Sequence, residues 1–285
     1  MPRVTFSASS DKQKPKLGQH FLDDESAAVQ IVDSLGDISH KTVFEIGPGR
    51  GVLTSLLARR ARRLIAVELD RVLAAQLRMQ FGQTRNVEIV EGDVLAIDFN
   101  TLFGPRPGTT RTESETTEPV SVVGNIPYYI TSELLLRLFE HRNYVESMVL
   151  MVQREVADRL AAAPGGSEYG LLSATAQLYA RVEKLFTLPP TAFTPPPKVH
   201  SAVVRLTIEP RLQELQVPER EFIDFLKVSF AQKRKTLGNN LKARYGAQEL
   251  KSALEQAGVK ATVRAETLSL EKNAAIFRAL HNGTM

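Results

Sequence analysis

The chain has 285 residues, of which 43% are hydrophobic and 24% charged, and a formal net charge of +4, so it is long enough for one large or two modest globular domains. It contains no cysteine, which excludes disulfides, zinc–thiolate sites and thiol catalysis and favours a cytoplasmic location. No run of about 18 apolar residues predicts a membrane helix, and the five histidines lack metal-ligand spacing, so neither a membrane nor a metal is expected.

The first part of the chain predicts a polar tail, a helix and then buried strands. Residues 1–15 are polar and without periodicity, as in a flexible tail, and residues 24–36 predict a helix that stops at Gly36. The short apolar runs that follow are nearly continuous, which is typical of parallel strands buried on both faces. These predicted strands are Thr42–Ile46, Leu64–Leu69, Val87–Val90 and Val120–Val123.

The middle of the chain continues this alternation. The expected helices are 131–141, 153–163 and 171–180, and the expected strand is 146–152. Two further apolar runs, Val182–Leu188 and Ser201–Ile208, are joined by a proline-rich loop and not by a helix, so they predict an antiparallel hairpin at the sheet edge. The pattern predicts an α/β fold with a doubly wound, mostly parallel sheet of seven strands.

The last part of the chain changes in pattern and in charge. After Pro210 only helical patterns follow, at Glu221–Lys233, Gln248–Ala257 and Leu270–Leu280. Residues 211–285 carry a net charge of +5, which suggests a polyanionic partner, although a solvated lysine-rich helical surface would explain the charge as well.

These changes suggest a division into domains. We expect a Rossmann-like domain over residues 16–209 and a small all-α domain over residues 210–285. Residues 103–119 are rich in Thr, Pro, Gly and Glu, which indicates a surface insertion in the first domain.

A glycine loop after the first parallel strand predicts a cofactor site. The spacing Gly47-x-Gly49-x-Gly51 lets the backbone approach a ligand closely. Glu68 ends the next strand and could accept hydrogen bonds from ribose hydroxyls, while Asp93 ends the third strand and could hold an adenine amine. The alternatives are an exposed strand-end acid for Glu68 and a helix N-cap for Asp93.

The loop alone does not separate NAD from S-adenosylmethionine, although a pyrophosphate loop more often reads G-x-G-x-x-G. Glu45, two residues before Gly47, could lie near the cationic end of S-adenosylmethionine.

The segment Asn125-Ile126-Pro127-Tyr128 at the end of the fourth strand predicts a clamp for a planar amine. The Asn125 oxygen and a nearby backbone carbonyl could accept the two amine hydrogens and orient the nitrogen for methyl transfer. Pro127 stiffens the turn, and Tyr128 offers a stacking face for an extruded base. Phe193 could cap the other face. The alternatives are a simple turn with a packed tyrosine, and a core phenylalanine.

Six motifs run through the chain in a fixed order, namely Gly18–Leu22, Glu45–Thr54, Gly92–Leu95, Asn125–Tyr129, Phe193–Val203 and Arg234–Leu241. Over about residues 14–280 the chain resembles the ribosomal RNA small-subunit adenine dimethyltransferases, the family whose bacterial members confer kasugamycin sensitivity. The resemblance implies a class I S-adenosylmethionine-dependent methyltransferase fold. It also implies dimethylation of two adjacent adenosines near the 3′ end of 16S rRNA in an assembling small ribosomal subunit. A monomer is the default expectation.

The resemblance also implies residue roles. S-adenosylmethionine would be contacted by Gln19, His20, Leu22, Gly47, Glu68, Asp93 and Asn125. The target adenine would be held by Asn125 and Tyr128 and flanked by Phe193, and Lys233, Arg234 and Lys235 would dock on the rRNA backbone. Position 20 is often Asn in the family, so His20 is expected to contact the cofactor through its backbone as much as through its side chain.

Three other functions compete with this interpretation. A large-subunit rRNA methyltransferase of the erythromycin-resistance type shares the glycine loop and the clamp, but the Phe193–Val203 and Arg234–Leu241 segments argue against it. A ribosome-assembly checkpoint would depend on binding more than on catalysis. An NAD oxidoreductase is disfavoured because no acid or base for hydride transfer accompanies the clamp.

Overall fold

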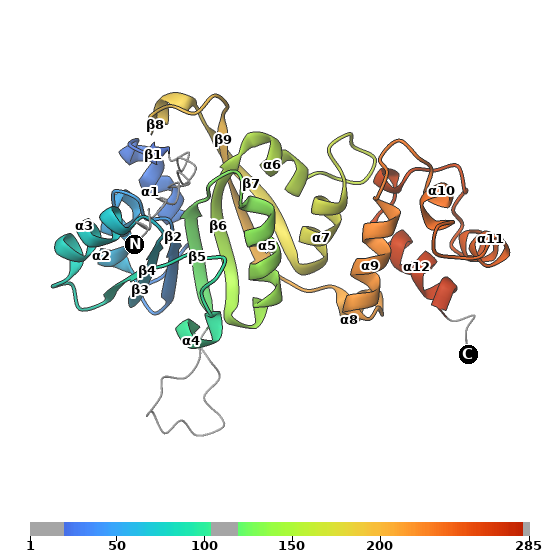
Figure 1. Ribbon diagram of the computed structural model, residues 1–285, viewed down its shortest axis with the longest axis horizontal. Helices are drawn as coiled ribbons and strands as arrows, with labels where there is room; N and C mark the ends of the chain where they lie inside the picture. Colours follow the sequence, from blue (N-terminus) through green and yellow to red (C-terminus); the bar gives the residue numbers. More distant parts are fainter. Residues whose placement is uncertain (1–19, 104–118, 282–285) are drawn as a thin grey trace, which may run out of the picture.

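The computed structural model describes residues 20–103 and 119–281, and its centre is a seven-stranded sheet (Figure 1). The strand order is β4-β3-β2-β5-β6-β9-β7. The strands from β4 to β6 in this order are mutually parallel, whereas β9 runs antiparallel to both β6 and β7. The predicted sheet with an antiparallel hairpin at its edge is confirmed. The strands are β2 (Thr42–Ile46), β3 (Arg63–Glu68), β4 (Val87–Glu91), β5 (Val120–Asn125), β6 (Val145–Gln153), β7 (Ala180–Leu188) and β9 (Ser201–Ile208).

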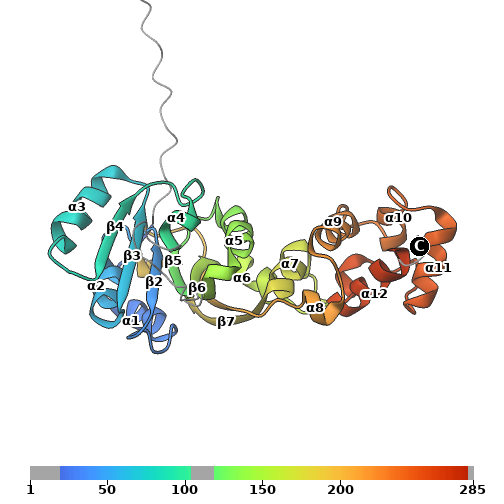
Figure 2. The ribbon, with the colours of Figure 1, turned by 90° about the horizontal axis from the view of Figure 1, so that it is seen from below.

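Helices cover both faces of this sheet (Figure 2). Alternate residues of a strand point to opposite faces, so Val43 belongs to the hydrophobic cluster that includes residues of α1 and α2. Phe44 belongs to the cluster that includes residues of α4, α5, α6 and α7, and its ring contacts Phe99 and Phe103 of α4. The same alternation separates Val149 from Met148 in β6. The nearly continuous apolar runs of these strands are thus explained by burial on two faces. The helices before residue 210 are α1 (Glu25–Asp33), α2 (Val52–Arg60), α3 (Arg71–Phe81), α4 (Phe99–Phe103), α5 (Thr131–Glu140), α6 (Arg154–Leu160) and α7 (Leu171–Tyr179).

The described residues after β9 form helices and connecting loops that extend away from the sheet (Figure 1). Their core includes edge-to-face contacts of Phe277 with Phe222 and Phe225, at ring-centroid distances of 5.5 and 5.6 Å. Glu219 connects this region to the sheet body, since it accepts hydrogen bonds from Arg142 and from the Tyr179 hydroxyl at 2.7 and 2.8 Å. The helices are α8 (Leu212–Leu215), α9 (Glu219–Ser229), α10 (Leu237–Leu241), α11 (Ala247–Gln256) and α12 (Leu270–His281).

Several features of the fold differ from the sequence-based expectations. The short helices α8 and α10 were not predicted, and α6 ends at Leu160 and not at residue 163. Helix α9 ends at Ser229 and not at Lys233. Phe230 is its C-cap residue, and the chain turns after it. A second, two-stranded sheet pairs β1 (Phe21–Leu22) with β8 (Phe193–Thr194), which no local pattern indicated. The expected tail 1–15, Gln19 and residues 104–118 of the expected insertion lie outside the described residues.

The sheet topology predicts where a ligand can bind. Strands β2 and β5 are neighbours, and the chain runs outward from them in both directions, through β3 and β4 on one side and β6 on the other. A crevice at the carboxyl ends of the strands is characteristic of such a switch point. Within the described part of the chain, none of the helices has the length and apolar character needed to span a bilayer.

Candidate active site

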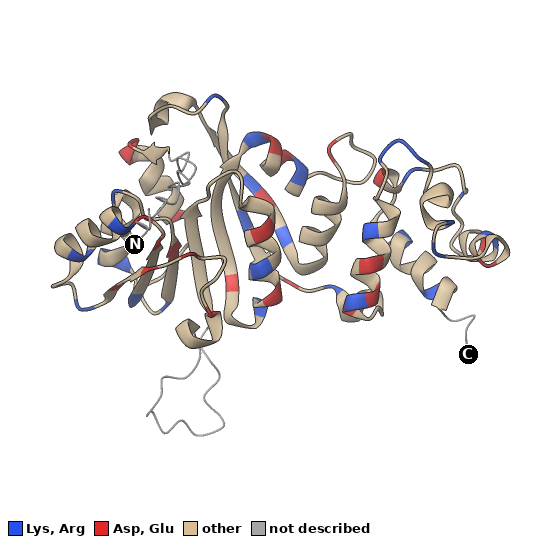
Figure 3. Ribbon diagram, viewed as in Figure 1, with Lys and Arg blue, Asp and Glu red and all other residues tan. Residues whose placement is uncertain are grey.

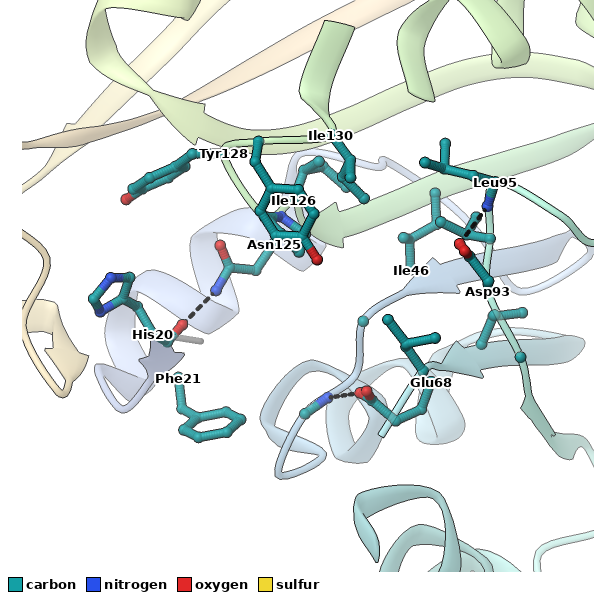
Figure 4. A pocket seen from close by; sticks show the side chains of 18 residues that line it. His20, Phe21, Ile46, Glu68, Asp93, Leu95, Asn125, Ile126, Tyr128 and Ile130 are labelled. Carbon is teal, nitrogen blue, oxygen red and sulfur yellow. Dashed lines mark hydrogen bonds between the residues drawn. The ribbon is translucent and has the colours of Figure 1, made fainter. Parts of the chain in front are cut away.

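A pocket lies at the carboxyl ends of β2, β3, β4 and β5 (Figure 4). Six of the residues predicted to contact the cofactor or the target base line it, namely His20, Gly47, Glu68, Asp93, Asn125 and Tyr128. They come from segments up to about a hundred positions apart, and the parallel strands bring them to one edge of the sheet.

The glycine loop after β2 forms one wall of the pocket. Gly47, Gly49 and Gly51 have φ values of 65°, 57° and 83°, which are unfavourable for residues with a Cβ. A Cβ at Gly49 would also lie 2.9 Å from the Phe21 ring. The Arg50 guanidinium lies over the same ring at 4.6 Å. The loop therefore needs glycine both for its backbone shape and for the close packing of Phe21.

The Glu68 carboxylate holds the glycine loop in place and faces the pocket. It is only 3% exposed, so it is not the exposed strand-end acid considered above. Its Oε2 accepts a hydrogen bond from Gly49 N at 3.0 Å, and its Oε1 accepts one from Asp70 N at 2.9 Å. Burial raises the pKa of the Glu68 carboxyl, and the backbone N–H groups of Asp70 and Gly49 oppose that rise. Each oxygen retains a lone pair for a further donor.

Asp93 follows β4, the strand that pairs with β3, so it lies on the same side of the pocket as Glu68 (Figure 4). Its Oδ1 accepts a hydrogen bond from Leu95 N at 2.9 Å, two residues on, which is an Asx-type turn and not a helix cap. The side chain is exposed, and Figure 4 shows it near Leu95 and Ile46 at the edge of the pocket. Its other oxygen can accept a hydrogen bond from a ligand.

Asn125 ends β5 in the middle of the pocket, and its amide has one defined orientation. Its Nδ2 donates a hydrogen bond to the backbone oxygen of His20 at 2.8 Å, so its Oδ1 points the other way (Figure 4). Within the described residues nothing donates to that oxygen. Gly124 before it allows the close approach of β5 to β2, because a Cβ there would lie 2.5 Å from the Ile46 oxygen.

The turn after Asn125 presents Tyr128 to the pocket. Ile126 N donates to Met151 O at 3.0 Å and Ile130 N donates to Pro127 O at 3.1 Å, which anchors the turn at both ends. The Tyr128 hydroxyl shares a 2.9 Å hydrogen bond with Ser201 Oγ. Its ring lies 6.2 Å from the His20 ring at an interplanar angle of 29°. His20 is held in turn by a 2.7 Å hydrogen bond between its Nδ1 and the Pro195 oxygen.

Two residues predicted to contact the cofactor or the target base lie outside this pocket. Leu22 and Phe193 are partners in the β1–β8 sheet, with exposed fractions of 5% and 3%, and both pack in the hydrophobic cluster that contains α1 and α2. For Phe193 to contact a base, its ring would have to leave this cluster. Both roles stay predictions.

The expectation that Glu45 faces the cofactor is wrong for this structure. Its side chain is fully buried and does not line the pocket. The Thr54 hydroxyl donates to its Oε2 at 2.8 Å, whereas its Oε1 has no partner among the described residues. Burial raises the pKa of the Glu45 carboxyl to about 8, so the group is mostly neutral at pH 7. Because β2 is buried on both faces, the alternation of its side chains directs Glu45 toward α2, where it meets Thr54.

Several pocket residues were given no role in the sequence analysis, although some lie within its motifs. They include Phe21, Ile46, Val67, Leu95, Tyr129 and Ile130. Ile46 and Val67 are strand-end residues whose position beside the glycine loop and Glu68 could have indicated them. No local pattern could predict that Phe21 lies in the pocket, because its ring contacts the glycine loop only when β1 pairs with β8.

The chemistry of this pocket fits an adenosine-type cofactor. Its walls carry apolar side chains such as Val67 and Ile130, and its acids Glu68 and Asp93 supply acceptors suited to ribose hydroxyls and to an adenine amine. Among the described residues that line it, none is Lys or Arg. A phosphate group would therefore find no cationic side chain there.

The three predicted RNA-contacting residues lie apart from the pocket. Lys233, Arg234 and Lys235 are exposed in the loop between α9 and α10, where Figure 3 shows a run of basic residues. The Lys233 Nζ donates to the Ser167 oxygen at 2.8 Å, so this loop also contacts the segment before α7.

Comparison with known proteins supports this picture. The model of the ribosomal RNA adenine dimethylase family matches residues 10–282. The chain is 53% identical over 285 residues to the ribosomal RNA small subunit methyltransferase A of Koribacter versatilis, covering 99% of this chain and 100% of the relative. It is 54% identical over 277 residues to the protein of the same name from Acidobacterium capsulatum, covering 97% and 94% of the two chains.

Two solved structures match most of the chain. A dimethyladenosine transferase from Plasmodium falciparum superposes with a TM-score of 0.76 at 25% identity, covering 90% of this chain and 96% of that one. The 23S rRNA methyltransferase ErmE superposes with a TM-score of 0.68 at 26% identity, covering 92% and 99%. The predicted methyltransferase sheet with additional carboxyl-terminal helices is thus confirmed.

Proposed function

This chain belongs to the ribosomal RNA adenine dimethylase family and is an S-adenosylmethionine-dependent rRNA methyltransferase. We propose that it dimethylates two adjacent adenosines near the 3′ end of small-subunit rRNA. The small-subunit assignment is supported by the relatives at 53% and 54% identity, both of which are named small-subunit enzymes. The substrate that we propose is an assembling small ribosomal subunit, modified in the cytoplasm by a monomer that needs no metal.

The cofactor supplies an activated methyl group, and the residues of the pocket bind and orient it. We propose that Glu68 accepts hydrogen bonds from the ribose hydroxyls and that Asp93 accepts one from the adenine amine, with the adenine between apolar side chains such as Val67 and Ile130. Gly47 and the backbone of His20 would contact the methionine part. Gln19 and Leu22 are proposed as contacts from the family resemblance alone.

The observation that carries the proposal is the orientation of Asn125. The hydrogen bond from its Nδ2 to His20 O leaves Oδ1 free to accept from the target amine. With a backbone carbonyl of the same turn as second acceptor, the amine lone pair would be aimed at the methyl group. Tyr128 offers a face for stacking of the extruded base, and Phe193 is proposed for the other face. No general base is required, since the methylated amine readily loses its proton.

We propose that residues 210–285 form an RNA-binding domain attached to the methyltransferase domain 16–209. Its exposed Lys233, Arg234 and Lys235 would contact phosphates, which position the enzyme without reading sequence. An assembly-checkpoint role could accompany catalysis. It would be supported if an Asn125→Ala variant, inactive in methylation, restored normal subunit assembly in a strain that lacks the enzyme.

The test uses purified protein, tritiated S-adenosylmethionine and unmethylated small subunits, with mature large subunits in parallel. Dimethyladenosine formed only on the small subunit, identified by nucleoside chromatography, is the expected result. Label on large-subunit rRNA would favour the activity in the name of ErmE. No label on either subunit would contradict the proposed reaction.

A further inference from the structure

Ser201 contacts the proposed base clamp without lining the pocket. It is the first residue of β9, is 1% exposed, and pairs with Gln153 of β6 and Leu188 of β7. Its Oγ lies 2.9 Å from the Tyr128 hydroxyl, 73 residues away in the sequence. The Ser201 backbone is therefore held between two strands, while its side chain reaches the turn that follows β5.

This hydrogen bond holds the distal end of the Tyr128 side chain. The proximal end is anchored by the turn, through Ile126 N to Met151 O and Ile130 N to Pro127 O. Without the hydroxyl contact, the half-buried ring could rotate about χ1 and χ2, and an extruded base would meet a less ordered face. A hydroxyl fixed by the central sheet restricts this rotation at small entropic cost, since Ser201 has few conformations to lose.

We propose that Ser201 is a positioning residue for methyl transfer, which acts through Tyr128 by fixing the plane of the ring on which the target base stacks. The inference rests on the proposed function, because it assumes that the base stacks on Tyr128. The Phe193–Val203 segment thereby gains a role, the positioning of the Tyr128 ring by Ser201, that does not require Phe193 to contact the base. The segment also holds His20 through Pro195 O, so it supports both rings that border the clamp.

The test is a double-mutant cycle with Ser201→Ala, Tyr128→Phe and the combined variant. Tyr128→Phe keeps the stacking ring and removes only the hydroxyl. Ser121→Ala is the matched control, because Ser121 is a fully buried serine of the same sheet whose hydroxyl donates to Glu146 and which does not line the pocket. For each protein, kcat and KM for unmethylated small subunits, the Kd for S-adenosylmethionine and the thermal midpoint would be measured.

We expect Ser201→Ala and Tyr128→Phe each to lower kcat by about two- to tenfold, the range of one hydrogen bond between neutral groups. The double variant should be no worse than either single variant, because both remove the same contact. The cofactor Kd should stay within about twofold in all variants, and Ser121→Ala should keep the kcat of the unmodified protein.

Three results would overturn the inference. Unchanged kcat in Ser201→Ala, with an active unmodified enzyme, would show that the contact does not position the ring. Multiplied losses in the double variant would show that the two hydroxyls act independently. If Ser201→Ala lowered the thermal midpoint and weakened cofactor binding together with the loss of kcat, the role of Ser201 would be purely structural. If the unmodified protein itself transfers no methyl group, the proposed function fails and the inference fails with it.

Discussion

The side-chain amide of Asn125 donates a 2.8 Å hydrogen bond to the backbone oxygen of His20, a residue 105 positions earlier in the chain. An asparagine amide without this bond could flip and present its NH2 group to the pocket. The His20 carbonyl accepts only from the NH2 side, so it determines that the oxygen faces the ligand. The geometry therefore selects an acceptor at this position, which is what a target amine requires.

Asn125→Ala should abolish this acceptor and lower methyl transfer by on the order of 100-fold, the cost of removing one polar group that acts on a transition state. Because the half-buried side chain sits at the end of a strand, folding should be intact. Methylation rates and thermal midpoints would check both statements. Asn125→Asp serves as the companion variant, since its carboxylate cannot donate to His20 O and should also be impaired. Full activity in Asn125→Ala would refute the clamp.

Glu68→Ala should weaken S-adenosylmethionine binding by roughly 10- to 100-fold, the range for hydrogen bonds to a charged group. Part of this loss would arise because Gly49 N and Asp70 N lose their acceptor, so the loop would be less ordered. Calorimetric titration measures the Kd. An unchanged value would contradict the proposed contact with the ribose.

Gly49→Ala should destabilise the protein and weaken cofactor binding for two reasons. Alanine at φ 57° carries backbone strain of about 1 kcal/mol, and its Cβ would lie 2.9 Å from the Phe21 ring. Gly36→Ala is the control, since φ there is 70° but nothing lies within 4 Å of the added Cβ. Urea unfolding should show a larger loss for Gly49→Ala, and only this variant should bind the cofactor less tightly. Equal losses with unchanged binding would mean that the contact with Phe21 is unimportant.

The buried carboxyl of Glu45 should make stability depend on pH. Its pKa is about 8 in the folded protein against a model value of 4.5, because burial disfavours the charged form. Below pH 4.5 the carboxyl is protonated in both the folded and the unfolded protein, so its burial costs no stability through ionisation. As the pH rises through the window between the two values, the unfolded chain loses the proton first and the free energy of unfolding falls.

Glu45→Gln removes this titration and keeps an acceptor for the Thr54 hydroxyl. The difference in free energy of unfolding between the variant and the unmodified protein should therefore grow in favour of the variant from pH 5 to pH 9. Urea unfolding at pH 5, 7 and 9 would measure it. A difference that does not change with pH would mean that Glu45 is ionised throughout.

Replacement of Lys233, Arg234 and Lys235 by alanine should weaken binding to the small subunit. The slope of log K against log salt should decrease in magnitude by about 0.7 to 0.9 for each phosphate contact that is lost. Arg85→Ala is the control, since Arg85 is exposed and lies before β4, at the edge of the sheet opposite the pocket. Filter binding over a range of salt concentrations would give the slopes. An unchanged slope in the triple variant would locate the RNA surface elsewhere.

Local patterns were sufficient to predict the strands of the sheet and the residues that gather at their carboxyl ends. The strands β2, β3 and β5 can be recognised in the sequence as continuous apolar runs, because they are buried on both faces and therefore do not alternate with polar residues. The glycine loop, Glu68 and Asp93 follow consecutive parallel strands, whose carboxyl ends must meet at one edge. The helix boundaries were less accurate, as for α9, because a helix end depends on the local caps.

The sequence by itself determined the fold class, the glycine loop, the strand-end acids and the Asn125–Tyr128 turn, because each follows from periodicity or from a short motif. The tertiary structure alone decided which side chains reach the pocket. The pairing of β1 with β8 buries Leu22 and Phe193, and the alternation in β2 directs Glu45 toward α2. It also decided the contacts of Asn125 with His20 and of Tyr128 with Ser201. These depend on how distant segments pack, and no local pattern specifies the relative position of such segments.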